Sequence, residues 1–188
     1  MEADFAIELG ADDEVLEMPW AAPDGSLRYH DLKRYPELLR EIQEVQRAPE
    51  LGDFLVTANS RSGILESAKC DVWSSDQIHP EEEIFGSKIK FGCYVDLLFS
   101  PEPSRLSFEQ HENAVRRLTR ILQEAPGLPA AAEFLVRRCY YHREQQVAEG
   151  FYITLYLFGY GADENEARRQ WGAGLRVVEK AIRQWSEP

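Results

Sequence analysis

The chain has 188 residues, of which 44% are hydrophobic, and its formal net charge is −12. This length can build one hydrophobic core, with or without an N-terminal annex. The negative charge excludes a general nucleic-acid binder, because contacts to phosphate require lysine and arginine. No apolar run approaches the roughly 20 residues that cross a membrane, and the acidic N-terminus lacks the layout of a secretory signal.

The cysteines indicate the compartment. Cys70, Cys93 and Cys139 are widely spaced, odd in number and form no CxxC pair. We expect free thiols that act as small buried hydrophobic side chains, which is typical of a reducing cytoplasm. A catalytic thiol is not expected, because Cys139 and His142 have opposite parity on their predicted strand.

Residues 1–63 predict an arm and an annex. Residues 1–14 are acidic and read as a mobile arm or a short edge strand. Residues 15–63 form the annex: residues 15–20 and 27–32 flank Pro23-Asp24-Gly25, which predicts a hairpin. Helical spacing then predicts helices over residues 35–45 and 49–58.

Residues 64–188 predict an α+β core. Alternating apolar residues indicate strands over residues 64–73, 88–100, 131–143 and 150–160. Ser107 and Asp163 are predicted to cap two amphipathic helices. The order ββαββα is a permuted ferredoxin-like order. We expect an antiparallel sheet with strands 88–100 and 150–160 at its centre and both helices on one face.

Residues 150–160 distinguish the two faces of that sheet. Odd-numbered residues from Phe151 to Leu157 are apolar and predict the face beneath the helices. The other face carries Tyr152, Thr154, Tyr156, Phe158 and Tyr160. Large aromatic side chains with hydroxyl groups suit a ligand floor, a cover formed by the annex or a subunit contact.

The candidate ligand site lies on this second face. Its residues come from three predicted strands, on each of which they alternate onto this face. They are Tyr94, Asp96, Arg137, Tyr141, Tyr152 and Tyr156. Arginine could bind a carboxylate or phosphate in a bidentate manner. The alternative is a strand-edge arginine paired with a surface acid such as Glu133 or Glu144.

Other motifs do not predict a site. The four histidines lack metal-ligand spacing, so we expect no metal site and treat them as surface or satisfied residues. Gly159 and Gly161 lack the further glycine and lysine of phosphate-binding loops, and no cofactor is expected. Glu81, Glu82 and Glu83 predict a solvated loop.

Three functions follow from the aromatic face. The leading hypothesis is a cytoplasmic binding or regulatory module for a small molecule, working as a homodimer, with neither nucleic acid nor membrane as partner. The second is an enzyme with a Tyr or His acid–base, Arg137 as anion clamp and Asp96 as orienting group. The third is a structural or protein-interaction role without a ligand.

Overall fold

The computed structural model describes residues 1–125, 127–144 and 146–186. The strands share one sheet and are β1 (Glu2–Glu8), β2 (Val15–Met18), β3 (Leu65–Ser75), β4 (Ile89–Phe99), β5 (Ala130–Arg143) and β6 (Gln146–Gly161). The α-helices are α1 (Gln43–Arg47), α2 (Pro49–Ala58), α3 (Glu102–Arg105), α4 (Phe108–Gln123) and α5 (Glu164–Ser186). Two 3-10 helices are η1 (Pro36–Glu41) and η2 (Pro80–Phe85).

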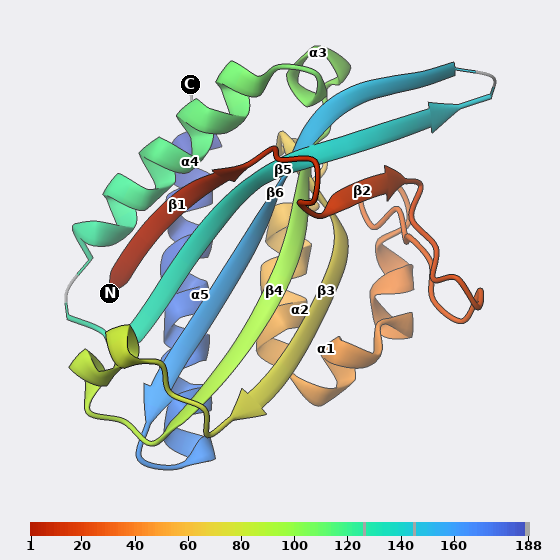
Figure 1. Cartoon of the computed structure of the whole chain (residues 1–188). Helices are drawn as coiled ribbons and strands as arrows, with labels where there is room; N and C mark the ends of the chain where they lie inside the picture. Colours follow the sequence, from red (N-terminus) through yellow and green to blue (C-terminus); the bar gives the residue numbers. More distant parts are fainter. Residues whose placement is uncertain (126, 145, 187–188) are drawn as a thin grey trace.

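The sheet has the strand order β1-β5-β6-β4-β3, and β2 also pairs with β5 (Figure 1). The pairs β5–β6, β6–β4 and β4–β3 are antiparallel, whereas β1 and β2 both run parallel to β5. The four strands of the predicted core therefore lie in the predicted order, with β4 and β6 in the middle. The strand β1 extends this sheet at its β5 edge.

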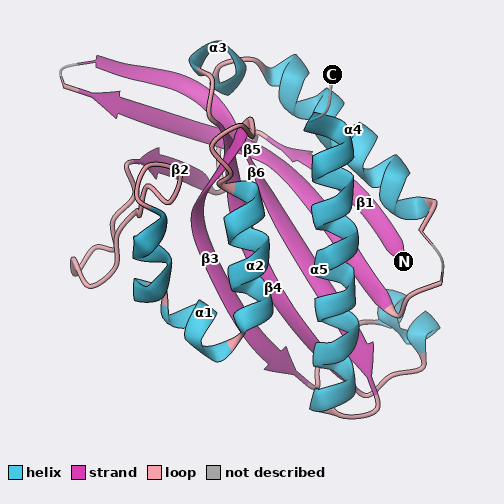
Figure 2. Cartoon of the chain, turned by 180° about the vertical axis from the view of Figure 1, so that it is seen from behind, coloured by secondary structure: helices cyan, strands magenta, loops and turns pink. Residues whose placement is uncertain are grey.

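Helices α2, α4 and α5 cover one face of the sheet (Figure 2). Apolar side chains from α2, α4 and α5 form one cluster with the inward side chains of β4, β5 and β6. Phe54, Leu118 and Trp171 are fully buried there, and Ile153, Leu155 and Leu157 of β6 face them. The alternation in residues 150–160 thus predicted the helix-covered face correctly.

The caps of α4 and α5 explain where these helices begin. The Ser107 hydroxyl accepts a hydrogen bond from the Gln110 amide at 3.3 Å. Asp163 accepts one from the Glu166 amide, and the Glu166 carboxylate accepts one from the Ala162 amide, both at 2.8 Å. These bonds satisfy amide groups that the first helical turn leaves without partners.

Close contact between α5 and β6 depends on two glycines. A Cβ added at Gly159 would overlap the backbone of Trp171 and Ala167, and one at Gly161 would overlap Ala167. The Gly159-Tyr160-Gly161 sequence therefore serves helix-to-strand packing, because only glycine leaves room for the helix backbone.

The N-terminal half differs from the prediction in its pairing. The turn predicted at Pro23-Asp24-Gly25 forms, but the pairing across it is short. It consists of the antiparallel bridge between Ala21 and Arg28, with backbone hydrogen bonds from Ala22 N to Leu27 O and from Tyr29 N to Trp20 O. Val15–Met18 instead pairs in parallel with β5, where Leu16 and Met18 become buried. Burial against the sheet therefore decides the pairing of residues 15–18, and the turn signal decides only the residues next to the turn.

Two helical predictions also change. The helix predicted over residues 35–45 is divided into η1 and α1, with Ile42 in extended conformation between them. Residues 1–14 contribute the edge strand β1. The helix predicted over residues 49–58 forms with those bounds as α2.

Candidate functional site

The helix-free face of the sheet has three zones along β6. Tyr152 lies in an end that is covered by β2 and the segment following it. Thr154 belongs to a central charge network. Tyr156, Phe158 and Tyr160 line an open groove. Arg137 joins several of the six predicted site residues across these zones: its side chain is hydrogen-bonded to Tyr156 and acts electrostatically on Tyr152 and Asp96. Tyr94 packs against Tyr156, and Tyr141 packs with Tyr152 at the covered end.

The charge network joins three strands to the N-terminal segment. The Thr154 hydroxyl donates to Asp96 Oδ1 at 2.7 Å and accepts from Arg137 Nη1 at 3.3 Å. Arg137 also donates from Nε to Glu8 Oε2 at 2.7 Å and from Nη1 to Glu14 Oε2 at 3.1 Å. The partners of Arg137 are therefore Glu8 and Glu14, brought there by the parallel pairing of β1 with β5.

Arg137 is thus paired with acidic side chains, as the alternative to an anion site predicted, but the partners are Glu8 and Glu14 and not Glu133 or Glu144. Neither of those carboxylates is its ion-pair partner, because Glu8 is aligned with Arg137 in the β1–β5 register. The guanidinium is already bonded to two carboxylates and a hydroxyl, and its side chain is only 10% exposed. It has little capacity left to bind an anionic ligand in this conformation.

Asp96 is the buried acid of the network and is 2% exposed. Burial raises its pKa to about 6, while the Thr154 hydroxyl and the charges of Lys69 and Arg137 act in the opposite direction. Lys69 Nζ lies 3.9 Å from Asp96 Oδ2 and 3.4 Å from Glu14 Oε1. Desolvation therefore outweighs the nearby cations at this carboxyl.

The covered end holds Tyr141 and Tyr152. They pack in a cluster with Leu16, Met18, Leu98 and Cys139. Tyr141 donates its hydroxyl hydrogen to the carbonyl oxygen of Phe151 at 2.9 Å, and Tyr152 is fully buried. Burial raises the pKa of both phenols. A ligand in the groove would not touch either side chain.

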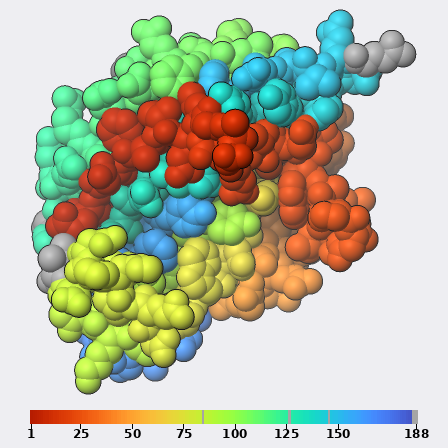
Figure 3. Space-filling view, in the orientation of Figure 1, coloured from red at the N-terminus to blue at the C-terminus, as the bar shows by residue number. Residues whose placement is uncertain are grey.

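The groove on this face has a volume of about 850 Å³. Tyr156, Phe158 and Tyr160 form its floor. One wall comes from β1, and the other comes from His79 and η2. Figure 3 shows the hollow between the red N-terminal strand and the yellow-green segment near residue 80, with blue atoms of β6 at its base. This volume lies within the range of about 300–1,000 Å³ typical of ligand sites.

Glu82 attaches η2 to the sheet. Its carboxylate accepts hydrogen bonds from Lys90 Nζ at 2.8 Å, the Tyr160 hydroxyl at 2.7 Å and the His79 amide at 2.8 Å. Burial would raise the pKa of Glu82, but these three bonds outweigh it and lower the pKa. The prediction of a solvated loop over residues 81–83 is therefore wrong for Glu82, whose side chain lies between η2 and the sheet and is only 13% exposed.

Aromatic rings continue across the sheet beside the groove. We call this set the aromatic band; it comprises Trp73, Phe85, Tyr94, Tyr156, Phe158 and Tyr160. Neighbouring ring centroids are 4.2 to 6.4 Å apart, which is the separation of favourable aromatic pairs. A Cβ at Gly92 would lie 2.5 Å from the Phe158 ring, so glycine leaves that ring room to lie on β4.

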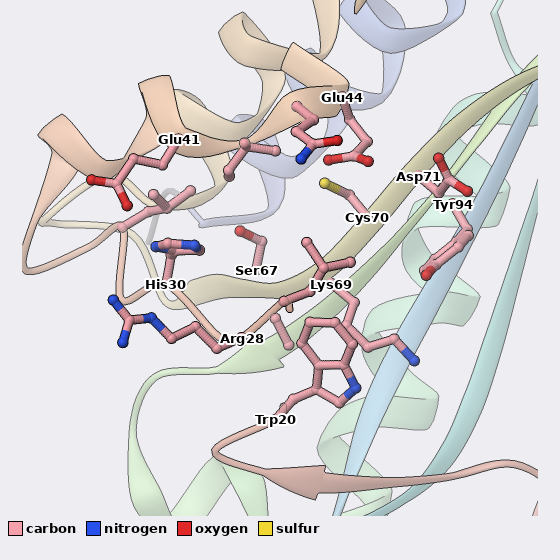
Figure 4. A pocket seen from close by; sticks show the side chains of 15 residues that line it. Trp20, Arg28, His30, Glu41, Glu44, Ser67, Lys69, Cys70, Asp71 and Tyr94 are labelled. Atoms are coloured by element: carbon pink, nitrogen blue, oxygen red, sulfur yellow. The ribbon is translucent and has the colours of Figure 1, made fainter. Parts of the chain in front are cut away.

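A second, smaller pocket lies at the other edge of the sheet (Figure 4). Glu41 and Glu44 face Ser67 and Cys70 of β3 across a cavity of about 200 Å³, and Trp20 closes it on the side of the N-terminal segment. This volume is below the usual range for ligand sites. Burial raises the pKa of Cys70, so its thiol is not an activated nucleophile.

The remaining candidate groups are structural. Cys93 accepts a hydrogen bond from Trp171 Nε1 at 3.3 Å, and all three cysteines are free thiols. His111 is fully buried against Phe99, not a surface residue, and burial lowers its pKa. Within the described ranges, no group of three or more His, Cys, Asp or Glu residues could hold a metal ion.

The groove residues that sequence reasoning missed include Lys90, Glu82 and Glu133. Lys90 has the parity of Tyr94 and Asp96 and could have been found by continuing that alternation. Glu82 reaches the face through η2, whose path no local pattern predicts. Glu133 was considered only as a partner for arginine, although it is aligned with Tyr156.

The comparisons with known proteins give no relative. No family model matches the chain, and no curated protein or solved structure resembles it significantly. No described helix has the length and apolar character needed to cross a membrane.

Proposed function

We propose that the chain is a small-molecule-binding module whose ligand occupies the groove on the helix-free face. The observation that supports this most directly is the 850 Å³ hollow with Tyr156, Phe158 and Tyr160 at its floor. Ligand sites are concave and largely apolar, with a few polar groups that fix orientation. Lys90, Glu82 and Glu133 are among the polar groups of this groove.

Binding is favoured over catalysis by the position of the titratable groups. Asp96, whose pKa is raised by burial, is enclosed in the charge network and does not line the groove. Arg137 is bonded to Glu8, Glu14 and Thr154. A general acid or base has to reach its substrate, and neither group is free to do so.

The same proposal includes the class of the core and the compartment. The sequence of β3, β4, α4, β5, β6 and α5, with the order β5-β6-β4-β3, supports a permuted ferredoxin-like core. The free cysteines support a cytoplasmic protein. Homodimer formation remains a prediction that light scattering would test.

A thermal-shift screen of a metabolite library tests the binding function. A ligand at about 100 times its Kd adds about 2.7 kcal/mol to the free energy of unfolding, which corresponds to a rise in Tm of roughly 5–10 °C for a chain of this size. We expect Tyr156→Ala and Phe158→Ala to reduce this rise, because both remove the groove floor.

Tyr140→Ala is the matched control, because Tyr140 lies on the opposite parity of β5 and does not line the groove. It should leave the ligand-induced rise in Tm unchanged. A library without any stabilising compound, or compounds that stabilise Tyr156→Ala as much as the original chain, would contradict the proposal.

A further inference from the structure

The aromatic band already receives two ammonium groups from the chain itself. Lys69 Nζ lies 5.4 Å from the Trp20 ring centroid and 6.0 Å from that of Tyr94. Lys90 Nζ lies 5.1 Å from the Phe158 ring centroid. A cation over an aromatic face is attracted by the ring quadrupole, and most strongly when it is shielded from water.

Each of these ammonium groups also has a carboxylate partner. Lys69 lies near Glu14 and Asp96, and Lys90 pairs with Glu82 at 2.8 Å. The Lys90 and Glu82 side chains are only 8% and 13% exposed. The same unit therefore occurs twice on this face: an aromatic ring, a carboxylate and the ammonium between them.

A third ring and carboxylate lie side by side without an ammonium. Glu133 is aligned with Tyr156 in the β5–β6 register, and both line the groove. Within the part of the chain that the structure describes, no lysine or arginine lies over the Tyr156 ring and Glu133 forms no ion pair. Arg137 acts electrostatically on Glu133 and is hydrogen-bonded to Tyr156, but its guanidinium is bonded to Glu8 and Glu14.

The surroundings of Glu133 favour binding of a cation. Partial burial raises its pKa, and the charges of Glu8 and Asp4 raise it further, while Arg137 opposes them. Asp4 faces the same groove. Negative charge is therefore concentrated beside the Tyr156 ring, and a positively charged ligand group would lower its electrostatic energy.

We propose that the ligand of the groove is an organic cation, whose ammonium group lies over Tyr156 beside Glu133 and whose apolar body extends over Phe158. This inference rests on the proposed binding function and specifies the class of ligand. The charge complementarity of the groove selects this occupant: five acidic side chains and a single lysine line it, and that lysine is already paired with Glu82.

Three probes with the same ring and different charge test the inference: 2-phenylethylamine, 2-phenylethanol and 3-phenylpropionate. Their affinities are measured by NMR titration, which also locates the perturbed amides. We expect the amine to shift the amides of β6 near Tyr156 and to bind at least about tenfold more tightly than the alcohol, with the anion weakest.

Substitutions at Glu133 and Tyr156, with Asp53→Asn as control, locate the ammonium group. Glu133→Gln should weaken binding of the amine by about three- to tenfold and leave the alcohol unchanged. Asp53→Asn, on the exposed side of α2, changes the net charge equally and should leave the amine affinity within about twofold. Tyr156→Phe should retain amine binding and Tyr156→Leu should weaken it, because only phenylalanine keeps the aromatic face.

The outcomes separate the two proposals. Equal binding of all three probes at the groove, or tighter binding of the anion, would overturn the cation inference and leave the binding function intact. If none of the probes perturbs the groove amides at millimolar concentration, the cation inference is wrong, and the metabolite screen decides the binding function independently. If Asp53→Asn lost as much amine affinity as Glu133→Gln, the effect would depend only on the net charge of the protein, and the inference would also be overturned.

Discussion

Asp96 shows what burial does to a single group. Its carboxyl ordinarily has a pKa near 3.8, and burial raises that value to about 6 in the folded chain. The folded state therefore holds this proton over a pH range in which the unfolded state has lost it. The stability that the proton contributes is fully present below about pH 4 and is lost as the pH rises through 6.

Asp96→Asn removes this titration and retains an oxygen that can accept from Thr154. We expect the free energy of unfolding of the variant, relative to the original chain, to increase by about 2–3 kcal/mol between pH 4 and pH 7. Urea unfolding at several pH values measures the difference. Asp53→Asn serves as control, and a difference for Asp96→Asn that stays constant with pH would show that its pKa is not raised.

Gly159 and Gly172 differ in how much space the packing around helix α5 leaves for a side chain. Gly159 on β6 lies against the backbone of α5, which leaves no space for a side chain. Gly172 lies within α5, and a Cβ there would meet Glu50 Cγ at 3.5 Å, an ordinary contact. The first glycine is required by packing, and the second is not.

Alanine at these two positions should therefore have opposite effects. Gly159→Ala should lower the free energy of unfolding by about 2 kcal/mol or more, because α5 must move away from β6. Gly172→Ala should raise it by about 0.5–1 kcal/mol, since alanine favours helix more than glycine does. Denaturant unfolding of both variants tests the pair, and destabilisation by Gly172→Ala would contradict the assigned packing.

The sequence predicts elements whose pattern is local. Alternation over residues 88–100 and 150–160 predicts both strands and the face of Tyr94, Asp96 and Tyr156. The position of Trp73 could not be predicted, because an irregularity between Ser67 and Cys70 shifts the register of β3. The carboxylate partners of Arg137 lie 129 and 123 residues away along the chain, and no local pattern records such contacts.

At the scale of the whole molecule, the N-terminal segment holds the β5 edge and the charge network together. It supplies β1, β2, Glu8 and Glu14. The division into an arm at residues 1–14, an annex at 15–63 and a core at 64–188 remains a prediction. Leu51 and Phe54 of the annex share one apolar cluster with the core, so we expect the two to unfold together.

Removing residues 1–14 should destabilise the chain strongly. The chain would lose β1 and both carboxylate partners of Arg137. Because Glu8 and Glu14 are 34% and 49% exposed, each ion pair contributes about 1 kcal/mol or less, and most of the loss comes from the β5 edge, which would be opened to aggregation. Urea unfolding and size-exclusion chromatography measure these effects.

The double variant Glu8→Gln/Glu14→Gln separates the charges from the strand and should cost less than the truncation. Glu2→Gln/Asp4→Asn is its control, because those side chains do not bond to Arg137, and it should be close to neutral. If the truncated chain unfolds at the same urea concentration as the full chain, β1 does not stabilise the sheet.

The parallel alignment of β1 with β5 also has a consequence for the order of events during synthesis. The first strand leaves the ribosome long before its neighbour in the sheet, since Glu2 is aligned with Ala131. The nascent segment remains without its strand partner while more than a hundred further residues are translated. Glu2, Asp4 and Glu8 keep this waiting strand negatively charged, which discourages premature association with other growing chains.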